Sequence, residues 1–213
     1  MEITRFSFNP FQEITYVLWD KKSLQCAIID PGCLTADEQE TLSQFIADNH
    51  LLVKHLLLTH LHIDHYYGVP FVAHTYKVEV EANAAEKQLL DLMQEQALAF
   101  GSPAPADIIP ITKYLSDGDI LYIGDEPLQV IDVSGHSPGG LAFYAPESGF
   151  VCCGDALFQG SIGRTDFIGG NYKQLIDSLH KGLCTLPPDT VVYPGHGMET
   201  TIGDELRHNP FLQ

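Results

Sequence analysis

Long apolar runs are missing from this chain of 213 residues, although 45% of its residues are hydrophobic. No run approaches the roughly 18 apolar residues that suggest a membrane-spanning helix. Residues 1–12 also lack the basic start and following apolar stretch of a secretion signal. We therefore expect no membrane partner and a cytoplasmic protein, with enough length for one domain or two fused half-domains.

Cysteines are few, and no two of them have the spacing of a metal-binding or redox pair. The sequence contains no C-x-x-C pair, and its cysteines are odd in number: Cys26, Cys33, Cys152, Cys153 and Cys184. This pattern suggests neither a disulfide framework nor a thiolate zinc site. We expect buried, reduced thiols.

Basic residues are scarce as well. Lys and Arg together number 11 against 28 Asp and Glu, which gives a formal net charge of -17 at pH 7. Such a charge repels the phosphate backbone that dominates affinity for nucleic acids. We therefore expect no nucleic-acid partner.

Short apolar or alternating runs, bounded by Gly, Pro or Asp, indicate β-strands. They lie at residues 14–19, 26–29, 52–58, 120–123, 128–133, 141–145, 150–153 and 191–193. Helices interrupt them: Thr35 and Glu38 form a capping box, Asn171 can cap a second helix, and residues 84–100 form a third helical segment. Strands and helices mixed in this way predict an α/β fold in which helices cover sheets.

The stretch L-L-L-T-H-L-H-I-D-H-Y-Y-G, residues 56–68, places four metal-capable side chains directly behind an apolar run. In extended chain, His60 and His62 point to the same side and can bind one cation together. If a helix begins after them, Asp64 and His65 turn toward a neighbouring point that can hold a second cation. Burying several ionisable groups together is costly unless a cation compensates, so the cluster predicts metal binding.

Further metal-capable residues follow other predicted strands, where rigid scaffolds present chemistry. His136, Asp155 and His196 each come directly after a glycine, which lets the backbone pass close to a crowded centre. They are the candidate remaining ligands. Imidazole and carboxylate ligands without thiolate are typical of hydrolytic centres that keep open positions. The other histidines lack such neighbours, and we interpret them as ordinary core or surface residues: His50, His55, His74, His180 and His208.

The segment T-H-L-H-I-D-H-Y-Y-G resembles the T-H-x-H-x-D-H-x-x-G signature of the metallo-β-lactamase superfamily. The earlier segment I-D-P-G, residues 29–32, is similar to a strand-end motif of the same superfamily, whose aspartate supports the site from outside the metal ligands. This role would fall to Asp30. The resemblance implies one domain over residues 1–213, an αββα sandwich of two mixed β-sheets flanked by helices, with a dinuclear site at one edge.

Within the superfamily, G-D-A-L-F at residues 154–158, G-R-T-D-F at 163–167 and N-P-F-L at 209–212 resemble the short bacterial type of glyoxalase II. That class hydrolyses acylglutathione thioesters, so a small-molecule thioester is the implied substrate. The implied cofactors are two divalent metal ions, zinc or else iron. By the same resemblance, Asp155 bridges two ligand sets, which are His60, His62 and His136 for one ion and Asp64, His65 and His196 for the other.

Two cations about 3.5 to 4 Å apart lower the pKa of a shared water toward neutrality and so supply a hydroxide nucleophile. Asp64 and Asp155 are the implied catalytic residues: Asp64 orients the hydroxide and Asp155 fixes the spacing of the metals. Longer glyoxalase II enzymes carry a C-terminal helical region with basic contacts to glutathione, whereas Arg164 and Arg207 are the substrate-binding candidates here. Arg164 has an alternative interpretation as a salt bridge to Asp166 that braces the metal loop.

Three rival functions share features of this pattern. Persulfide dioxygenases have the same fold and a similar G-R-T-D-F stretch but use one mononuclear iron, so metal content and oxygen consumption distinguish them. RNA processing on this fold is disfavoured because no Lys/Arg patch is present. A non-catalytic metal-binding or scaffold protein would hydrolyse nothing in a panel of thioesters, lactones and phosphodiesters.

Overall fold

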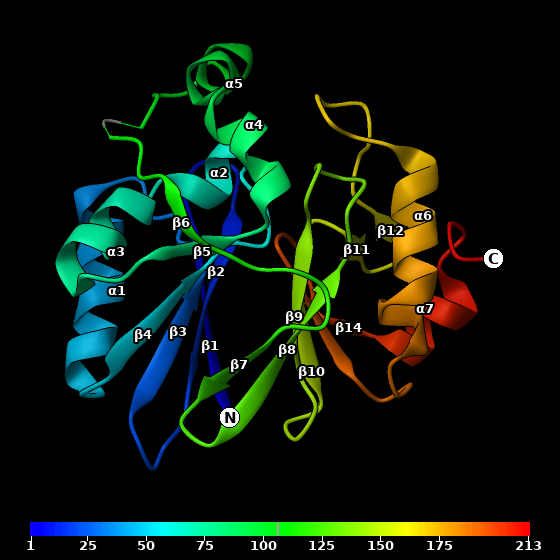
Figure 1. The fold of residues 1–213 in the computed structure, drawn as a ribbon, viewed down its shortest axis with the longest axis horizontal. Helices are drawn as coiled ribbons and strands as arrows, with labels where there is room; N and C mark the ends of the chain where they lie inside the picture. Colours follow the sequence, from blue (N-terminus) through cyan, green and yellow to red (C-terminus); the bar gives the residue numbers. More distant parts are fainter. Residues whose placement is uncertain (106) are drawn as a thin grey trace.

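The computed structural model describes residues 1–105 and 107–213, and Figure 1 shows two sheets in the middle of the molecule with helices on both outer sides. Each sheet contains both parallel and antiparallel strand pairs. This αββα arrangement of mixed sheets confirms the predicted α/β fold class.

The first sheet has six strands in the order β1-β2-β3-β4-β5-β6. Their bounds are Glu2–Phe8, Glu13–Trp19, Gln25–Ile29, Leu52–Leu57, Val80–Ala82 and Ile111–Tyr114. The second sheet also has six strands, in the order β14-β13-β10-β9-β8-β7. In chain order these strands are β7 (Ile120–Ile123), β8 (Glu126–Asp132), β9 (Leu141–Ala145), β10 (Phe150–Gly154), β13 (Val191–Pro194) and β14 (Thr200–Thr201). A small separate hairpin pairs β11 (Leu157–Phe158) with β12 (Ser161–Ile162).

Helices cover the outer face of each sheet. On the first half these are α1 (Ala36–Asp48) and α3 (Val69–Tyr76), and on the second half α6 (Tyr172–Lys181) and α7 (Ile202–His208) (Figure 1). The short helices α2 (Ile63–Tyr66), α4 (Lys87–Leu90) and α5 (Met93–Phe100) gather at one end of the sandwich. Two 3-10 turns, η1 (Ala84–Glu86) and η2 (Leu183–Thr185), complete the elements. Among the described residues, no helix combines the length and the apolar character needed to cross a membrane.

Alternation along the strands builds three apolar layers. Ala27 and Ile29 of β3 face the second sheet and pack in the layer between the sheets, whereas Cys26 and Ile28 face outward under the helices of the first half. Because both faces are buried, the strand is a continuous apolar run. A third layer lies between the second sheet and α6 and α7, around Leu175 and Leu179.

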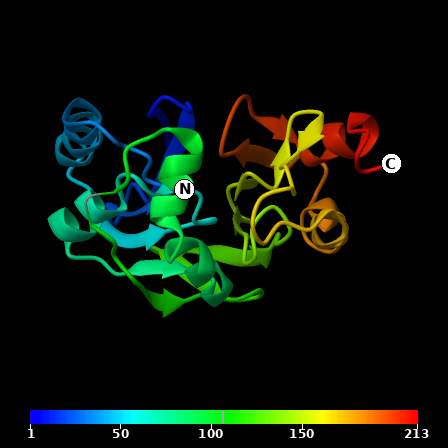
Figure 2. The same cartoon turned by 90° about the horizontal axis from the view of Figure 1, so that it is seen from above.

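Hydrogen bonds join the two halves near the end of the sandwich where α2, α4 and α5 gather. The Tyr16 hydroxyl donates to the Pro194 carbonyl at 2.7 Å, and Ile14 N–H donates to the Gly195 carbonyl at 2.8 Å. Leu141 N–H donates to the carbonyl of Thr59 at 2.8 Å. Figure 2 shows the halves as two groups of elements side by side when viewed from this end. The loops of both halves are therefore held against each other.

All eight predicted strands are present, with bounds that differ by at most two residues at an end. The capping box of α1 and the Asn171 cap of α6 are also confirmed. The predicted helix at 84–100 is instead three pieces, which together bury Leu89, Met93 and Ala97 in the core of the first half. The cysteines are free thiols, of which Cys184 is partly exposed and the others are buried.

Candidate metal centre

The segment after β4 leaves the sheet in extended conformation and becomes helical at Ile63. His62 is the N-cap residue of α2, with φ of -71° and ψ of 150°. His60 and His62 therefore keep the alternation of a strand, whereas Asp64 and His65 lie within the first turn of the helix. The local fold divides the four side chains into two pairs, as the sequence predicts.

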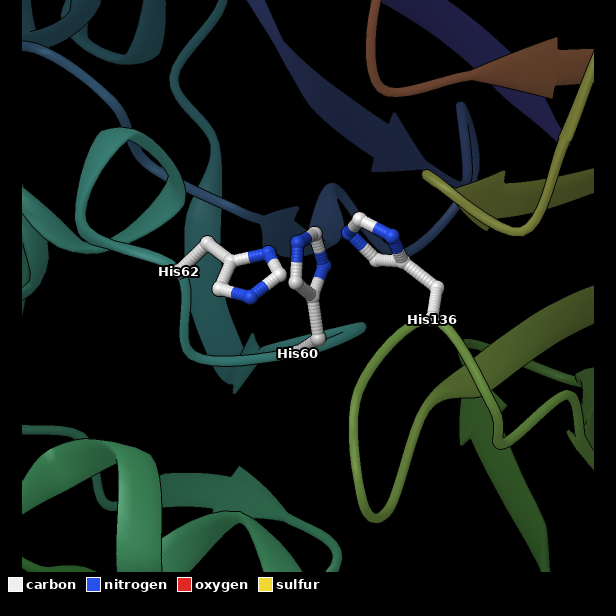
Figure 3. A group of neighbouring side chains, drawn as sticks. All are labelled: His60, His62 and His136. Atoms are coloured by element: carbon white, nitrogen blue, oxygen red, sulfur yellow. The ribbon is translucent and has the colours of Figure 1, made fainter. Parts of the chain in front are cut away.

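The first group of candidate ligands consists of His60, His62 and His136, whose side chains lie close together in Figure 3. One nitrogen from each lies within 4.8 Å of the others, and the ring centroids are 4.6 to 4.9 Å apart. All three side chains are buried, and the Nε2 atom of each has no hydrogen-bond partner among the described residues. Buried nitrogens without partners are costly, and a cation satisfies several such lone pairs at once.

The second group consists of Asp64, His65 and His196, whose ligand atoms also lie within 4.8 Å of one another. His196 Nε2 is 3.1 Å and His65 Nε2 is 3.7 Å from Asp64 Oδ2. Asp155 lies between the groups, with Oδ1 3.5 Å from His65 Nε2 and Oδ2 3.8 Å from His136 Nε2. The Asp155 carboxylate can therefore contact a cation in either group.

Asp30 orients one histidine of each group from outside. Its Oδ2 accepts a hydrogen bond from His65 Nδ1 at 3.0 Å and another from Thr59 Oγ1 at 2.5 Å. Thr59 Oγ1 in turn accepts a hydrogen bond from His60 Nδ1 at 3.0 Å. With Nδ1 protonated in both histidines, each Nε2 presents its lone pair to the centre. This is the supporting position that the sequence predicts for Asp30.

The loop from Gly163 to Phe167 supports the third histidine of the first group. Its Arg164 carbonyl accepts a hydrogen bond from His136 Nδ1 at 2.7 Å. The Arg164 guanidinium makes two 2.7 Å hydrogen bonds to Asp166 and lies 3.7 Å from the centroid of the Phe167 ring. The salt bridge considered for Arg164 and Asp166 is therefore present, and it braces the loop that positions His136.

Burial keeps the first group neutral. It lowers the pKa of His60 well below the ordinary value, and neighbouring imidazoles act in the same direction. Burial together with His136 lowers the pKa of His62 to about 3, and burial lowers the pKa of His136 itself. Neutral imidazole is the form that ligates metal.

Carboxylates control the second group. Burial acts to lower the pKa of His65 and of His196, but the nearby charges of Asp64 and Asp155 outweigh it and raise both values. The same histidines lower the pKa of Asp155, although its burial acts in the opposite direction. Two ionised carboxylates therefore remain in the centre at neutral pH.

One glycine permits the close approach of the second group. A Cβ atom at Gly195 would lie 2.3 Å from Asp155 Oδ1 and 2.6 Å from His65 Cε1. Only glycine fits this position without displacing both candidate ligands. The predicted role of the glycine before His196 is thus seen in the structure.

A cavity of about 420 Å³ opens over both groups. Its walls are mainly aromatic and aliphatic beyond the candidate ligands, and they include Phe11, Phe100, Phe158, Ile162, Arg164 and Phe167. Arg207, in contrast, lies on α7, bonds to Asp204 at 2.6 Å and does not line this cavity. The structure brings the seven candidate ligands, Asp30 and Arg164 together, and it leaves Arg207 outside.

Comparison with known proteins agrees with this geometry. The family model of the metallo-beta-lactamase superfamily matches residues 9–196. The chain belongs to the metallo-β-lactamase superfamily. It is 38% identical to hydroxyacylglutathione hydrolase GloC of Haemophilus influenzae over 213 residues, covering 100% of this chain and 98% of the relative.

Two solved structures are similar over nearly the whole chain. BLEG-1 B3 metallo-beta-lactamase has a TM-score of 0.89 at 34% identity, with 100% of both chains covered. TTHA1623 in a di-iron-bound form has a TM-score of 0.86 at 37% identity, with 98% of this chain and 100% of that chain covered. These relatives support the interpretation of this chain as a metallo-hydrolase that uses divalent metals. Their names give different substrates, and one of them specifies two irons.

Two buried acids of this metallo-β-lactamase centre do not stand out in the sequence. Glu86 accepts hydrogen bonds from Leu61 N–H at 2.8 Å and from Gly139 N–H at 2.6 Å, and so it links the two ligand loops of the first group. Glu13 is fully buried, with Oε1 4.0 Å from His65 Nδ1, and burial raises its pKa well above the ordinary value. Glu13 is the first residue of β2, and its place directly before an apolar run is the one sequence signal that could have indicated a buried acid.

Proposed function

We propose that this chain is a metal-dependent hydrolase of thioesters, similar to glyoxalase II, and that it binds two divalent ions. Zinc is the metal we propose, with iron as the alternative. His60, His62 and His136 would hold one ion, Asp64, His65 and His196 the other, and Asp155 would contact both. The name of the Haemophilus influenzae relative, hydroxyacylglutathione hydrolase, supports the thioester substrate.

The observation that carries this proposal is the set of buried polar atoms without partners at the centre. They are Nε2 of His60, His62, His65 and His136, and Oδ1 of Asp155. Each would cost about 1 to 3 kcal/mol if it stayed unsatisfied. One cation would serve the three histidines of the first group, and a second cation would serve His65 together with Asp155.

Bound divalent ions supply an acidified water and polarise a carbonyl group. Burial acts to raise the pKa of Asp64, but His65 and His196 lower it overall, so Asp64 stays ionised and can orient the attacking water. The aromatic walls make the surroundings of the scissile carbonyl less polar than water, which strengthens electrostatic interactions there. A thiol with an ordinary pKa of about 8.5 leaves as a thiolate, so the mechanism needs no proton donor for the leaving group.

Arg164 is the proposed substrate-contacting cation, because it lines the cavity. Its guanidinium is already bound by Asp166, so the contact to substrate would add to an existing ion pair. The role predicted for Arg207 stays a prediction, and its place outside the cavity favours the surface pairing with Asp204.

Metal analysis with a thioester assay tests the proposal. We expect about two equivalents of zinc or iron on protein purified without chelator, together with hydrolysis of lactoylglutathione. Asp64→Ala should retain the first ion, lose the second and lower kcat/KM by at least about 100-fold, because it removes a ligand and the orienting carboxylate. Asp107→Ala is the control, since Asp107 is an exposed acid that pairs with His74.

Three outcomes would contradict this function. A fully active preparation with one equivalent of metal would remove the two-ion mechanism. Oxygen uptake on a persulfide without thioester turnover would assign the chain to the mononuclear-iron dioxygenases. Turnover of a β-lactam but of no thioester would place it with lactamases such as the BLEG-1 neighbour.

A further inference from the structure

A second cleft, of about 120 Å³, adjoins the metal cavity at His62. It lies between the α4–α5 segment and the loop after Arg164, and its aliphatic and aromatic walls are Leu89, Leu92, Ala99, Phe100, Phe167 and Ile168. An apolar cavity of about 150 Å³ holds a benzene molecule, so this cleft has room for roughly four to six carbon atoms.

The polar residues at this cleft do not turn it into a polar site. The side-chain amide of Gln96 hydrogen-bonds to the backbone. Its Nε2 donates to the carbonyls of Leu61 at 3.2 Å and Leu89 at 3.0 Å, and its Oε1 accepts from Ile63 N–H at 3.0 Å. Glu95 is exposed at the rim and adds a negative charge there. An uncharged apolar group is therefore favoured inside, and an anionic one is disfavoured.

The cleft adjoins the metal cavity. His62, Phe100 and Phe167 line both spaces. The Phe167 ring lies edge-on to His62 with centroids 5.4 Å apart and edge-on to Phe100 at 5.6 Å, so these rings mark the boundary between the two spaces. The cleft is therefore the apolar space next to a carbonyl group bound at the centre.

The space on the His196 side of the centre has a mixed lining. A separate hollow of about 490 Å³ there is lined by Arg5, Ser7 and Gln12 together with Phe11, Ile14 and Met198. The cleft beside His62 is therefore the more uniformly apolar of the two spaces, whereas the hollow beside His196 also offers polar side chains. A thioester with an apolar acyl arm and a polar thiol arm is best accommodated with the acyl arm in the cleft.

We propose that the cleft beside His62 is the acyl-binding subsite, selective for uncharged apolar acyl groups of about four to six carbons, with the thiol arm over the His196 side. This assignment rests on the proposed thioester hydrolysis. Complete burial of a methylene group gives about a fourfold gain in kcat/KM, and in a half-open cleft about twofold is expected. From acetyl to hexanoyl the gain is therefore about tenfold or more.

The test compares acetyl, butanoyl, hexanoyl and adipoyl thioesters of one thiol, glutathione, on metal-loaded protein. We expect kcat/KM to rise to hexanoyl, and adipoyl, which ends in a carboxylate, to fall at least about tenfold below hexanoyl. Ala99→Phe fills the cleft from an exposed position on α5, and it should remove most of the hexanoyl preference. Leu98→Phe is the matched control, because Leu98 is 83% exposed on the same helix and does not line the cleft.

A binding measurement separates this inference from the catalytic one. S-hexylglutathione, which resists hydrolysis, should shift the methyl NMR signals of Leu92 and Ile168, whereas S-methylglutathione should not. Equal kcat/KM for acetyl and hexanoyl thioesters, or an unchanged preference in Ala99→Phe, would overturn the subsite and leave thioester hydrolysis intact. Binding of S-hexylglutathione with these shifts, but with no thioester hydrolysed, would show that the cleft binds an alkyl group and would overturn both the proposed reaction and the acyl assignment.

Discussion

A single buried carboxylate, Glu86, ties together the two loops that carry the first group of candidate ligands. One oxygen accepts from Leu61, which lies between His60 and His62, and the other accepts from Gly139 in the loop after His136. Burial raises the pKa of Glu86, while these backbone hydrogen bonds act to lower it. The geometry of the first group of candidate ligands thus depends on a residue that is not itself one of them.

Glu86→Gln should weaken the first metal site without removing a ligand. An amide has one oxygen acceptor, so either Leu61 or Gly139 would face an NH₂ group and lose its partner. Outer supports of this kind typically change metal affinity by about 10- to 100-fold. A competition titration with a chromophoric chelator measures this affinity.

Glu81→Gln is the matched control for Glu86→Gln. Glu81 is equally buried in the first half but pairs with Lys113 and His55, not with the ligand loops. Both variants should lose stability, and the metal affinity should fall in Glu86→Gln alone. The same loss of affinity in both would show that Glu86 acts only through general stability.

Acidification should release the second ion before the first. The pKa of His62 is lowered to about 3, so protons compete weakly for the first group. The pKa values of His65 and His196 are raised, so in the metal-free protein they take up protons at higher pH and compete with the second ion as pH falls. Elemental analysis after dialysis at stepwise lower pH measures the order.

Asp64→Ala provides the reference for this acid titration, because its remaining ion lies in the first group. That ion should persist at pH values where wild type has already lost one equivalent. Loss of both wild-type ions in one step would contradict the separate protonation of the two groups.

The sequence predicts an element well when the element's own residues carry the signal, either as an apolar run buried on both faces or as helix caps. β3 and α1 are examples, since the first has a continuous apolar run and the second has the Thr35 capping box. Elements such as β5 and β6 do not follow from the local pattern. They have three and four residues, and each includes a charged side chain. Their strand character comes from pairing, of β5 with β4 and of β6 with β5.

The candidate ligands were predictable because their spacing and their place after strands carry the information. The supporting position of Glu86 is not predictable from the sequence, because it comes from contacts with Leu61 and Gly139, which are distant in sequence. The cleft beside His62 was likewise hidden. The break between α4 and α5, which shapes that cleft, interrupts a segment whose composition favours one helix.

The cap of α1 allows a direct test of local sequence control. Thr35 Oγ1 accepts from Glu38 N–H, and the Glu38 carboxylate accepts from Thr35 N–H at 2.8 Å. Thr35→Ala should lower the free energy of unfolding by about 1 kcal/mol, measured by urea denaturation. Thr41→Ala, an exposed change within the same helix, should be neutral or stabilising because alanine is the better helix former. Equal losses in both would mean that the capping box contributes nothing measurable.

The candidate metal centre lies where the two halves of the sandwich meet, and its candidate ligands come from both halves. His60 follows a strand of the first sheet, whereas Asp155 and His196 follow strands of the second. Bound ions should therefore stabilise the docking of the halves as well as the loops. An ion at about 1,000 times its Kd adds about 4 kcal/mol to the stability of the native state.

Removal of metal should lower the unfolding temperature by about 10 °C or more, since 1 kcal/mol shifts it by about 2 to 4 °C in a chain of this size. Scanning calorimetry on chelated and zinc-reloaded protein measures the change. Magnesium, which prefers oxygen ligands, is the control ion and should not restore the higher temperature. An unchanged midpoint after chelation would argue against ions that join the halves.

The spread of ligands along the chain also has a consequence for synthesis on the ribosome. His196, a candidate ligand of the second ion, follows β13, which pairs with β10 in the interior of the second sheet. A nascent chain can arrange His60 and His62 early, but it lacks His136 and Asp155 until the second half emerges, and it lacks His196 until β13 has been made. With the proposed ligands, metal loading would be completed late in the production of this protein, and a ribosome stalled before residue 196 would carry a chain with an incomplete second site.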